Sequence, residues 1–324
     1  MKLDFDIRLN RYAAENKYRG IDFIEYRELS NIGLVDKNCI SFNDFINLND
    51  RLGSSIAQCY KNQHFFNIYI SPIADLLKTI DADQVVPVLI GDTDADDFLL
   101  PVLGKARVIG SKNITILKLN KPRHWGGDYK SGRFDNRPLS LKSLRCVWRG
   151  VPTGDWFSKG RTTSRFKLFE KYGKINSDLI DFGLSAYEPS TRIRLGASEK
   201  IELVKWIKGK LSINEMLEYA FILSLEGNDV STSLKWILAS NSIPVMPSPI
   251  FESWLLEGLL IDGFHYISVD LDKDDLVKTI SDLSAWGGRL KEISANGKIY
   301  MEMFVDDESE RLLEIAVIRN FLGL

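Results

Sequence analysis

The chain has 324 residues, of which 44% are hydrophobic and 27% are charged, and its formal net charge is -2. This is the composition of a soluble globular protein that is long enough for two domains with separate cores. The small net charge gives no electrostatic basis for binding nucleic acid or an anionic membrane.

Three features of the sequence indicate a cellular compartment. Residues 1–17 carry too many charges for a signal peptide, and no apolar run is long enough to span a membrane. The three cysteines, Cys39, Cys59 and Cys146, lack metal-ligand spacing and are typical of free thiols in a reducing compartment. We therefore expect a cytoplasmic protein.

The first third of the chain is expected to form one α/β unit. After mixed helical segments in residues 1–60, apolar runs predict strands at residues 65–70, 85–90, 106–109 and 114–119 and a helix at residues 72–80. The run at 85–90 (VVPVLI) is continuous, which is typical of a strand buried on both faces, and it ends in Gly91 and Asp92.

Residues 120–145 change in character, because Gly, Pro, Arg, Lys and aromatic residues dominate without periodicity. This pattern predicts a loop that crosses between domains. One interpretation is a solvated linker, since most runs of charge are solvated. The other is the wall of a cleft that holds sugar hydroxyls and phosphate, where Trp125 would stack on a sugar ring and Gly126 and Gly127 would admit close approach. Both interpretations remain open.

From residue 144 onwards the pattern is regular. Strands are predicted at residues 144–149, 179–184, 219–225, 243–246 and 265–269. Helices are predicted between and after them, at residues 161–172, 199–208, 231–240, 251–260, 274–286, 288–304 and 308–322. Alternation of this kind indicates βαβ units with a parallel sheet and right-handed crossovers.

Residues 223–266 contain the most distinctive stretch. A Gly-bearing turn at residues 226–229 follows a predicted strand, and the hydroxyls of Ser231, Thr232 and Ser233 follow the turn. These hydroxyls can cap the start of a helix, where free N–H groups and the helix dipole favour an anion. Lys235 would lie near the same anion. An α/β domain holds a phosphate in this way, outside the carboxyl ends of its strands.

This stretch, together with residues 147–150 (VWRG) upstream and 264–267 (FHYI) downstream, resembles glycosyltransferase family 90. That family includes the CAP10-like enzymes, the protein O-glucosyltransferases and the bacterial lipopolysaccharide A glycosyltransferases. The resemblance is clearest over residues 145–300 and rests on the order and spacing of the motifs. The missing signal peptide points to the bacterial type.

The resemblance implies a GT-B fold, in which two Rossmann-like α/β domains face a cleft and a helical tail follows. Residues 1–135 would form the acceptor-side domain and residues 136–305 the domain that binds the nucleotide sugar. The helix at residues 306–324 could then pack on the amino-terminal domain.

The resemblance also implies an inverting glycosyltransferase that needs no metal or other cofactor. Its donor would be a nucleotide sugar, expected to be a UDP-sugar, and its acceptor a glycan such as a lipopolysaccharide core. Contact with the inner face of the membrane would be peripheral at most. Residues 203–208 are a conceivable membrane patch, although the pattern is more typical of a helix that faces its own core.

Asp92 is the leading catalytic candidate. In the family, an aspartate at the end of this strand is the base that deprotonates the acceptor hydroxyl, and one carboxylate used in this way implies inversion. A structural alternative is that Asp92 and Asp94 cap a helix.

The donor site would use cationic side chains in place of a metal. Arg149, followed by Gly150 at a sharp turn, could make bidentate contacts with a phosphate. Arg161 or Arg165 matches a basic position of the family, although either could be a surface charge. Gly227, Ser231, Ser233 and Lys235 complete the predicted phosphate contacts, and Ser233 stands where many relatives have an arginine.

Glu252 begins the predicted helix at residues 251–260 and could hold the ribose of the donor, or it could simply favour the helix dipole. His265 is expected to be a hydrogen-bonded structural residue. His64 and His124 have no ligand spacing, so we predict no metal site.

Two other functions remain open. Asp92-Thr93-Asp94 resembles the Asp-x-Asp motif of metal-dependent GT-A glycosyltransferases, in which carboxylates hold magnesium or manganese. We rank it lower because the nucleotide-binding pattern follows Asp92 in the sequence. The other is a non-catalytic protein that binds glycans or nucleotides on the same scaffold. Motifs of the common hydrolases, ATPases and dehydrogenases are absent from the sequence.

Overall fold

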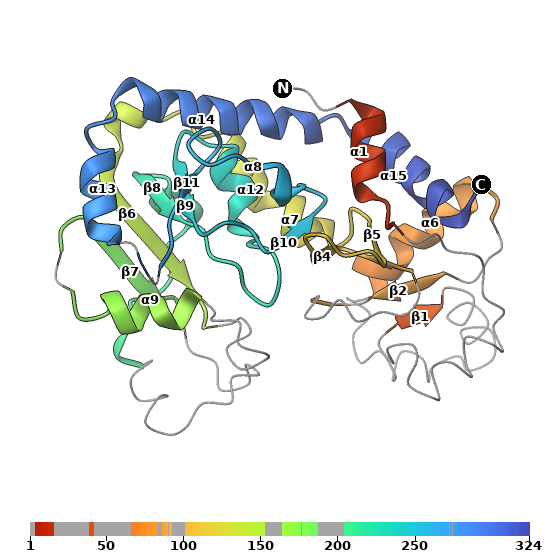
Figure 1. The fold of residues 1–324 in the computed structure, drawn as a ribbon, viewed down its shortest axis with the longest axis horizontal. Coiled ribbons are helices and arrows are strands. Elements are labelled where there is room, and N and C mark those ends of the chain that lie inside the picture. Colours follow the sequence, from red (N-terminus) through yellow and green to blue (C-terminus); the bar gives the residue numbers. More distant parts are fainter. Residues whose placement is uncertain are drawn as a thin grey trace. The chain divides into compact units, whose positions relative to one another are not determined.

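The computed structural model describes residues 4–15, 39–41, 66–82, 86–89, 91–92, 101–152, 164–175, 177–186, 204–271, 273 and 275–324. The chain divides into two compact units, whose elements are labelled in Figure 1. Residues 123–249 and 259–303 form one, here the five-stranded unit. Residues 2–122, 250–258 and 304–324 form the other, here the four-stranded unit. The domain boundaries expected from the sequence stay a prediction.

The five-stranded unit is built on a parallel sheet with the strand order β11-β9-β8-β6-β7. Its strands are β6 (Ser143–Gly150), β7 (Ile180–Leu184), β8 (Tyr219–Leu223), β9 (Ile243–Met246) and β11 (Ile267–Ser268). Each lies within a strand predicted from the sequence or overlaps it. The predicted α/β class with a parallel sheet is therefore confirmed.

Helices cover both faces of this sheet. They are α7 (Lys121–Trp125, at the boundary), α8 (Gly127–Arg133), η2 (Leu139–Leu141), α9 (Ser164–Tyr172), α11 (Ile213–Met216), α12 (Ser233–Leu238), α13 (Leu276–Leu283), α14 (Gly288–Met301) and η4 (Glu302–Phe304, at the boundary). Because successive strand residues point to opposite faces, Trp148 belongs to a core cluster with residues of α9, α13 and α14. Val147 belongs to a second cluster with Met216 of α11 and Ile237 of α12.

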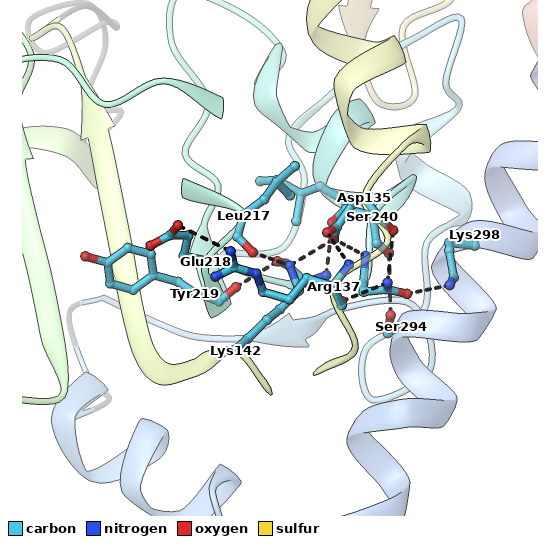
Figure 2. Close-up of polar contacts among 12 residues, drawn as sticks. Asp135, Arg137, Lys142, Leu217, Glu218, Tyr219, Ser240, Ser294 and Lys298 are labelled. Atoms are coloured by element: carbon cyan, nitrogen blue, oxygen red, sulfur yellow. Dashed lines mark hydrogen bonds and ion pairs between the residues drawn. The ribbon is translucent and has the colours of Figure 1, made fainter. Parts of the chain in front are cut away.

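A network of buried polar groups joins the amino-terminal ends of three strands (Figure 2). Lys142, directly before β6, donates to the carboxylate of Asp135 at 2.8 Å, to Ser242 Oγ at 2.9 Å and to the carbonyl oxygen of Leu217. Ser242 precedes β9, and Leu217 precedes β8. Asn241 donates from its main chain to the Asp135 carboxylate at 2.9 Å. This network fixes the strand starts at one edge of the sheet.

The four-stranded unit contains a sheet with the order β1-β2-β3-β5, in which β1 is antiparallel and the other pairs are parallel. Its strands are β1 (Cys39–Ser41), β2 (Pro87–Leu89), β3 (Val102–Gly104) and β5 (Ile114–Ile116), and a separate antiparallel ribbon joins β4 (Ala106–Val108) to β10 (Phe251–Ser253). The helices are α1 (Phe5–Tyr12), η1 (Phe66–Ile70), α6 (Ser71–Thr79), η3 (Glu257–Leu259, at the boundary) and α15 (Asp307–Leu322).

Buried charges fasten α15 within this unit. Glu310 of α15 pairs with Arg8 of α1 at 2.6 Å and with Lys118 at 2.8 Å, and it accepts a hydrogen bond from Trp254 Nε1 at 2.6 Å. Tyr12 stacks on Trp254 with ring centroids 3.9 Å apart. No helix in the described part of the chain has both the length and the apolar character of a membrane span.

Three predicted elements are wrong. Residues 121–133 form helices α7 and α8 instead of a loop. Gly132, which suggested a loop, lets α8 approach α12 closely, because an added Cβ would collide with the main chain of Trp236. The predicted strand at residues 65–70 is helical over Phe66–Ile70 and leads into α6. A short apolar run does not distinguish a buried strand from a buried helix.

The predicted helix at residues 251–260 is the third error, since β10 occupies residues 251–253. Glu252 lies opposite Arg107 in the register of β10 and β4. The two side chains form a buried ion pair at 2.9 Å. This long-range pair favours a strand where local spacing favours a helix. For the predicted helix at residues 199–208, the described part is helical only at 204–205, and Ile207 forms a bridge with Leu184.

Candidate functional site at the carboxyl edge of the sheet

The carboxyl ends of β6 and β8 lie side by side, because the two strands are parallel neighbours. Arg165 of α9 joins these ends, donating from Nη1 to the carbonyl oxygen of Val151 at 2.9 Å and from Nη2 to that of Leu225 at 3.0 Å. Gly150 ends β6, and an added Cβ there would lie 2.5 Å from the Trp148 ring. The close contact with Trp148 therefore requires a glycine at position 150, and Arg165 places a cation at the same edge.

Arg165 and Arg123 place positive charge at this edge. Burial, and secondly the charge of Arg123, lower the pKa of Arg165 to about 10. Arg165 as a residue is partly buried. A negatively charged group at this edge would offset both the burial of the guanidinium and its repulsion from Arg123.

Three serine hydroxyls lie in the chain segment that follows β8, and Leu225 of the same segment accepts the hydrogen bond from Arg165. Ser224 Oγ donates to Ser231 Oγ at 2.9 Å, and Ser231 Oγ lies 2.9 Å from Ser233 Oγ. The predicted capping role is wrong, because Thr232 is the N-cap of α12 and makes no side-chain capping bond, while the two serine side chains contact each other and Ser224. Ser224 was missed, although it directly follows the strand.

In the turn after β8, the Gly227 N–H donates to the carbonyl oxygen of Asp229 at 2.9 Å, and the contact of Gly227 with a phosphate stays a prediction. Trp125 and Lys235, predicted separately, lie together, since the Lys235 ammonium is 5.5 Å from the centre of the Trp125 ring. The Lys235 side chain is fully buried. In this conformation it faces the interior of the unit, and its contact with a diphosphate stays a prediction.

Gly126 and Gly127 lie at the start of α8, where Gly126 is the N-cap. Nothing lies within 4 Å of a Cβ added at Gly127, so no neighbouring group of this structure requires a glycine there. Their predicted place in a sugar cleft stays a prediction.

Arg149 lies on a face of the sheet in contact with Asp181, a residue that the sequence analysis missed. Its Nη2 is 2.9 Å and 3.0 Å from the two carboxylate oxygens of Asp181. Asp181 also accepts from Lys208 at 3.0 Å and from the Tyr219 hydroxyl at 3.2 Å. Burial raises the pKa of Asp181, but the hydrogen bonds from Lys208 and Arg149 outweigh it and hold the pKa below its usual value. Arg149 is therefore balanced by a carboxylate in this conformation.

Asp92 and Glu252 belong to the four-stranded unit and differ in their surroundings. Asp92 follows β2 after Gly91, which has a φ of 102°, and its side chain is 40% exposed. It pairs with Lys105 at 2.8 Å. Glu252 is 1% exposed and paired with Arg107, so the site predicted for it at a helix start does not exist. The buried ion pair gives Glu252 a structural role.

Arg161, His64 and Asp94 lie outside the described residues. Within the described ranges, no three His, Cys, Asp or Glu side chains gather as metal ligands. The absence of a metal site stays a prediction, because Asp94, a ligand in the metal-dependent alternative, is not among the described residues. His265 makes a structural contact, in which its Nδ1 accepts a hydrogen bond from the Ile261 N–H at 3.0 Å.

Comparison with known proteins finds similarity to an O-glucosyltransferase. The O-glucosyltransferase LpsA of Dichelobacter nodosus is 31% identical to the chain over 231 residues. The alignment covers 69% of the chain and 63% of the relative, so the chain spans less than two thirds of that protein's length. No protein-family model matches the chain. Membership of glycosyltransferase family 90 therefore stays a prediction.

Proposed function

We propose that the chain is a glycosyltransferase of GT-B type that moves a sugar from a UDP-sugar to a hydroxyl of a glycan, such as a lipopolysaccharide core. The similarity to a protein named as an O-glucosyltransferase supports the reaction class. The cationic carboxyl edge of the parallel sheet supports a donor with a phosphate, since α/β domains bind such ligands at that edge.

The observation that carries the proposal is the position of Arg165. Its guanidinium bridges the main chain after β6 and β8 and lies near the charge of Arg123. Leu225, which it contacts, directly follows Ser224, and the hydroxyls of Ser224, Ser231 and Ser233 contact one another. A nucleoside diphosphate would supply the anion that this edge favours. The cations would then stabilise the charge that develops on the departing diphosphate, which is the role a metal ion plays in other transferases.

Asp92 is the proposed base. Its carboxylate is 40% exposed and can accept the proton of the acceptor hydroxyl. The acceptor oxygen then forms a bond to the anomeric carbon while the bond from that carbon to the diphosphate oxygen breaks. A single displacement of this kind inverts the configuration at the anomeric carbon.

The donor site is tested by thermal-shift titration with UDP, GDP, CMP and ADP, each with and without EDTA. A ligand that binds only the folded state raises the melting temperature. We expect a shift specific to UDP that EDTA does not change and that Arg165→Met removes. Arg289→Met, which changes an exposed arginine of the same unit, is the control. The absence of a shift with every nucleotide would refute the donor site, and a shift lost in EDTA would favour the metal-dependent alternative.

The base is tested separately. Asp92→Asn should abolish transfer of the sugar from the donor and leave the UDP shift unchanged, because the carboxamide cannot take the proton. If the variant retains transfer, Asp92 is not the base. If the wild-type chain binds UDP but transfers no sugar, the non-catalytic alternative is favoured.

A further inference from the structure

A surface pocket of about 620 Å³ lies in the five-stranded unit near the amino-terminal ends of β6 and β8. It is lined by residues of α8, of the segment that follows α8, and of α11 and its end, namely Lys130, Ser131, Phe134, Asp135, Asn136, Arg137, Asn214 and Leu217. The proposed donor site lies at the other edge of the same sheet. Strand β6 separates the two edges by eight residues, about 26 Å at 3.3 Å per residue.

We propose that this pocket binds a saccharide. Phe134 is 76% exposed, and it stands beside polar side chains instead of within an apolar patch. An aromatic ring that is surrounded by hydrogen-bonding groups at the rim of a pocket is suited to a sugar, whose ring carries an apolar C–H face and hydroxyls at its edge.

The polar groups of the pocket match hydroxyls in their hydrogen bonding. Asn136 and Asn214 are exposed, and a carboxamide both donates and accepts hydrogen bonds, as a hydroxyl does. Arg137 adds donors. Its ion pair with Glu218 is 3.4 Å long between half-exposed side chains, and such surface pairs contribute little, so a ligand can displace it at small cost.

The loop that carries the aromatic ring is fixed before any ligand arrives. Asp135, the neighbour of Phe134, is held by Lys142, as Figure 2 shows. It also accepts a hydrogen bond from the main chain of Asn241. The Asn241 side chain donates to the carbonyl oxygens of Asp135 at 3.0 Å and Arg137 at 2.9 Å. Lys298 of α14 in turn donates to the Asn241 side chain at 2.6 Å. Because the loop is ordered in advance, binding requires little further loss of conformational entropy.

The distance along β6 bears on what the pocket holds. A single sugar unit that reacts near the donor phosphates cannot also occupy this pocket. The identity of the saccharide rests on the proposed function. If the chain transfers a sugar to a glycan, the pocket holds sugar units of an oligosaccharide acceptor that are remote from the reacting hydroxyl. Binding remote parts of a substrate is a general means of positioning it.

The inference is tested with an array of immobilised oligosaccharides of defined structure, which includes deacylated lipopolysaccharide cores. We expect the full chain to bind at least one saccharide and Phe134→Ala to weaken that binding at least tenfold. Leu141→Ala is the matched control, because Leu141 is 72% exposed and lies outside the pocket lining. It should bind as the wild type does.

Binding that is unchanged in Phe134→Ala, or no binding to any saccharide, would overturn the inference. Circular dichroism of both variants establishes that they fold. The UDP thermal shift separates this inference from the proposed function, because both variants should keep it. If the wild-type chain binds UDP and Phe134→Ala binds saccharides as tightly as the wild type does, only the pocket is refuted. If the wild-type chain shows no shift with any nucleotide, the donor site is refuted.

Discussion

Replacing Lys142 with methionine would remove a buried charge while leaving most of the volume of the side chain in place. The Lys142 side chain is fully buried, and that of its partner Asp135 is 4% exposed. Burial lowers the pKa of Lys142, and the hydrogen bond and charge of Asp135 oppose that effect. In the variant, the carboxylate of Asp135 would stay buried without its cation.

The expected loss of stability follows from this arrangement. Removing one partner of a buried ion pair typically costs about 3–5 kcal/mol, because the remaining charge is uncompensated. We expect a value of about 3 kcal/mol, near the lower end of this range, because the main-chain N–H groups of Asn241 and Arg137 still donate to Asp135. The double variant Lys142→Met/Asp135→Asn should lose less than Lys142→Met, since it leaves no buried charge unpaired.

The measurement is urea denaturation followed by circular dichroism, together with hydrogen exchange of peptides from β8 and β9. Hydrogen exchange reports the stability of the five-stranded unit by itself. This is needed because a chain of two units need not unfold in one step. Lys278→Met is the control, because the ion pair of Lys278 with Asp282 is exposed and should contribute little. If Lys142→Met is no less stable than this control, the reasoning from buried charge is refuted.

Two further predictions concern buried titratable groups. Burial lowers the pKa of His265 to about 4. Between pH 6.5 and pH 4, the unfolded chain therefore binds a proton at this histidine that the folded chain does not bind. The free energy of unfolding should fall as the pH decreases through this range. His265→Asn, whose carboxamide oxygen can accept the Ile261 N–H, should flatten this part of the pH profile, and an unchanged profile would contradict the assignment. Cys146 is fully buried, and burial also raises the pKa of its thiol. In a Cys39→Ser/Cys59→Ser chain, an aromatic disulfide reagent should therefore react with Cys146 only at the rate of unfolding. Rapid labelling in native buffer would show that Cys146 is accessible.

Sequence patterns identified the elements that carry the proposed site. The apolar runs of β6, β8 and β9 predicted a parallel sheet, and the position of Asp92 after the run at 85–90 agrees with its place after β2. These predictions succeeded because a strand that is buried on both faces requires consecutive apolar residues, and that requirement is local.

The errors arose where packing outweighed local signals. Gly132 suggested a loop, but it provides the close contact of α8 with α12. Residues 251–253 looked helical by spacing, but they form a strand that pairs with β4. Local propensity is weaker than the burial of a side chain against a neighbour that is distant in the sequence.

The sequence by itself determined the fold class, the order of the strands of the five-stranded unit along the chain, and the resemblance to a glycosyltransferase. Only the tertiary structure decided how the charged side chains are used. It pairs Arg149 with Asp181 and Glu252 with Arg107, partners 32 and 145 residues apart, and it brings Arg165 to the main chain after two neighbouring strands. A charge is assigned to structure or to a ligand by what lies beside it in space, and that is settled when distant segments pack together.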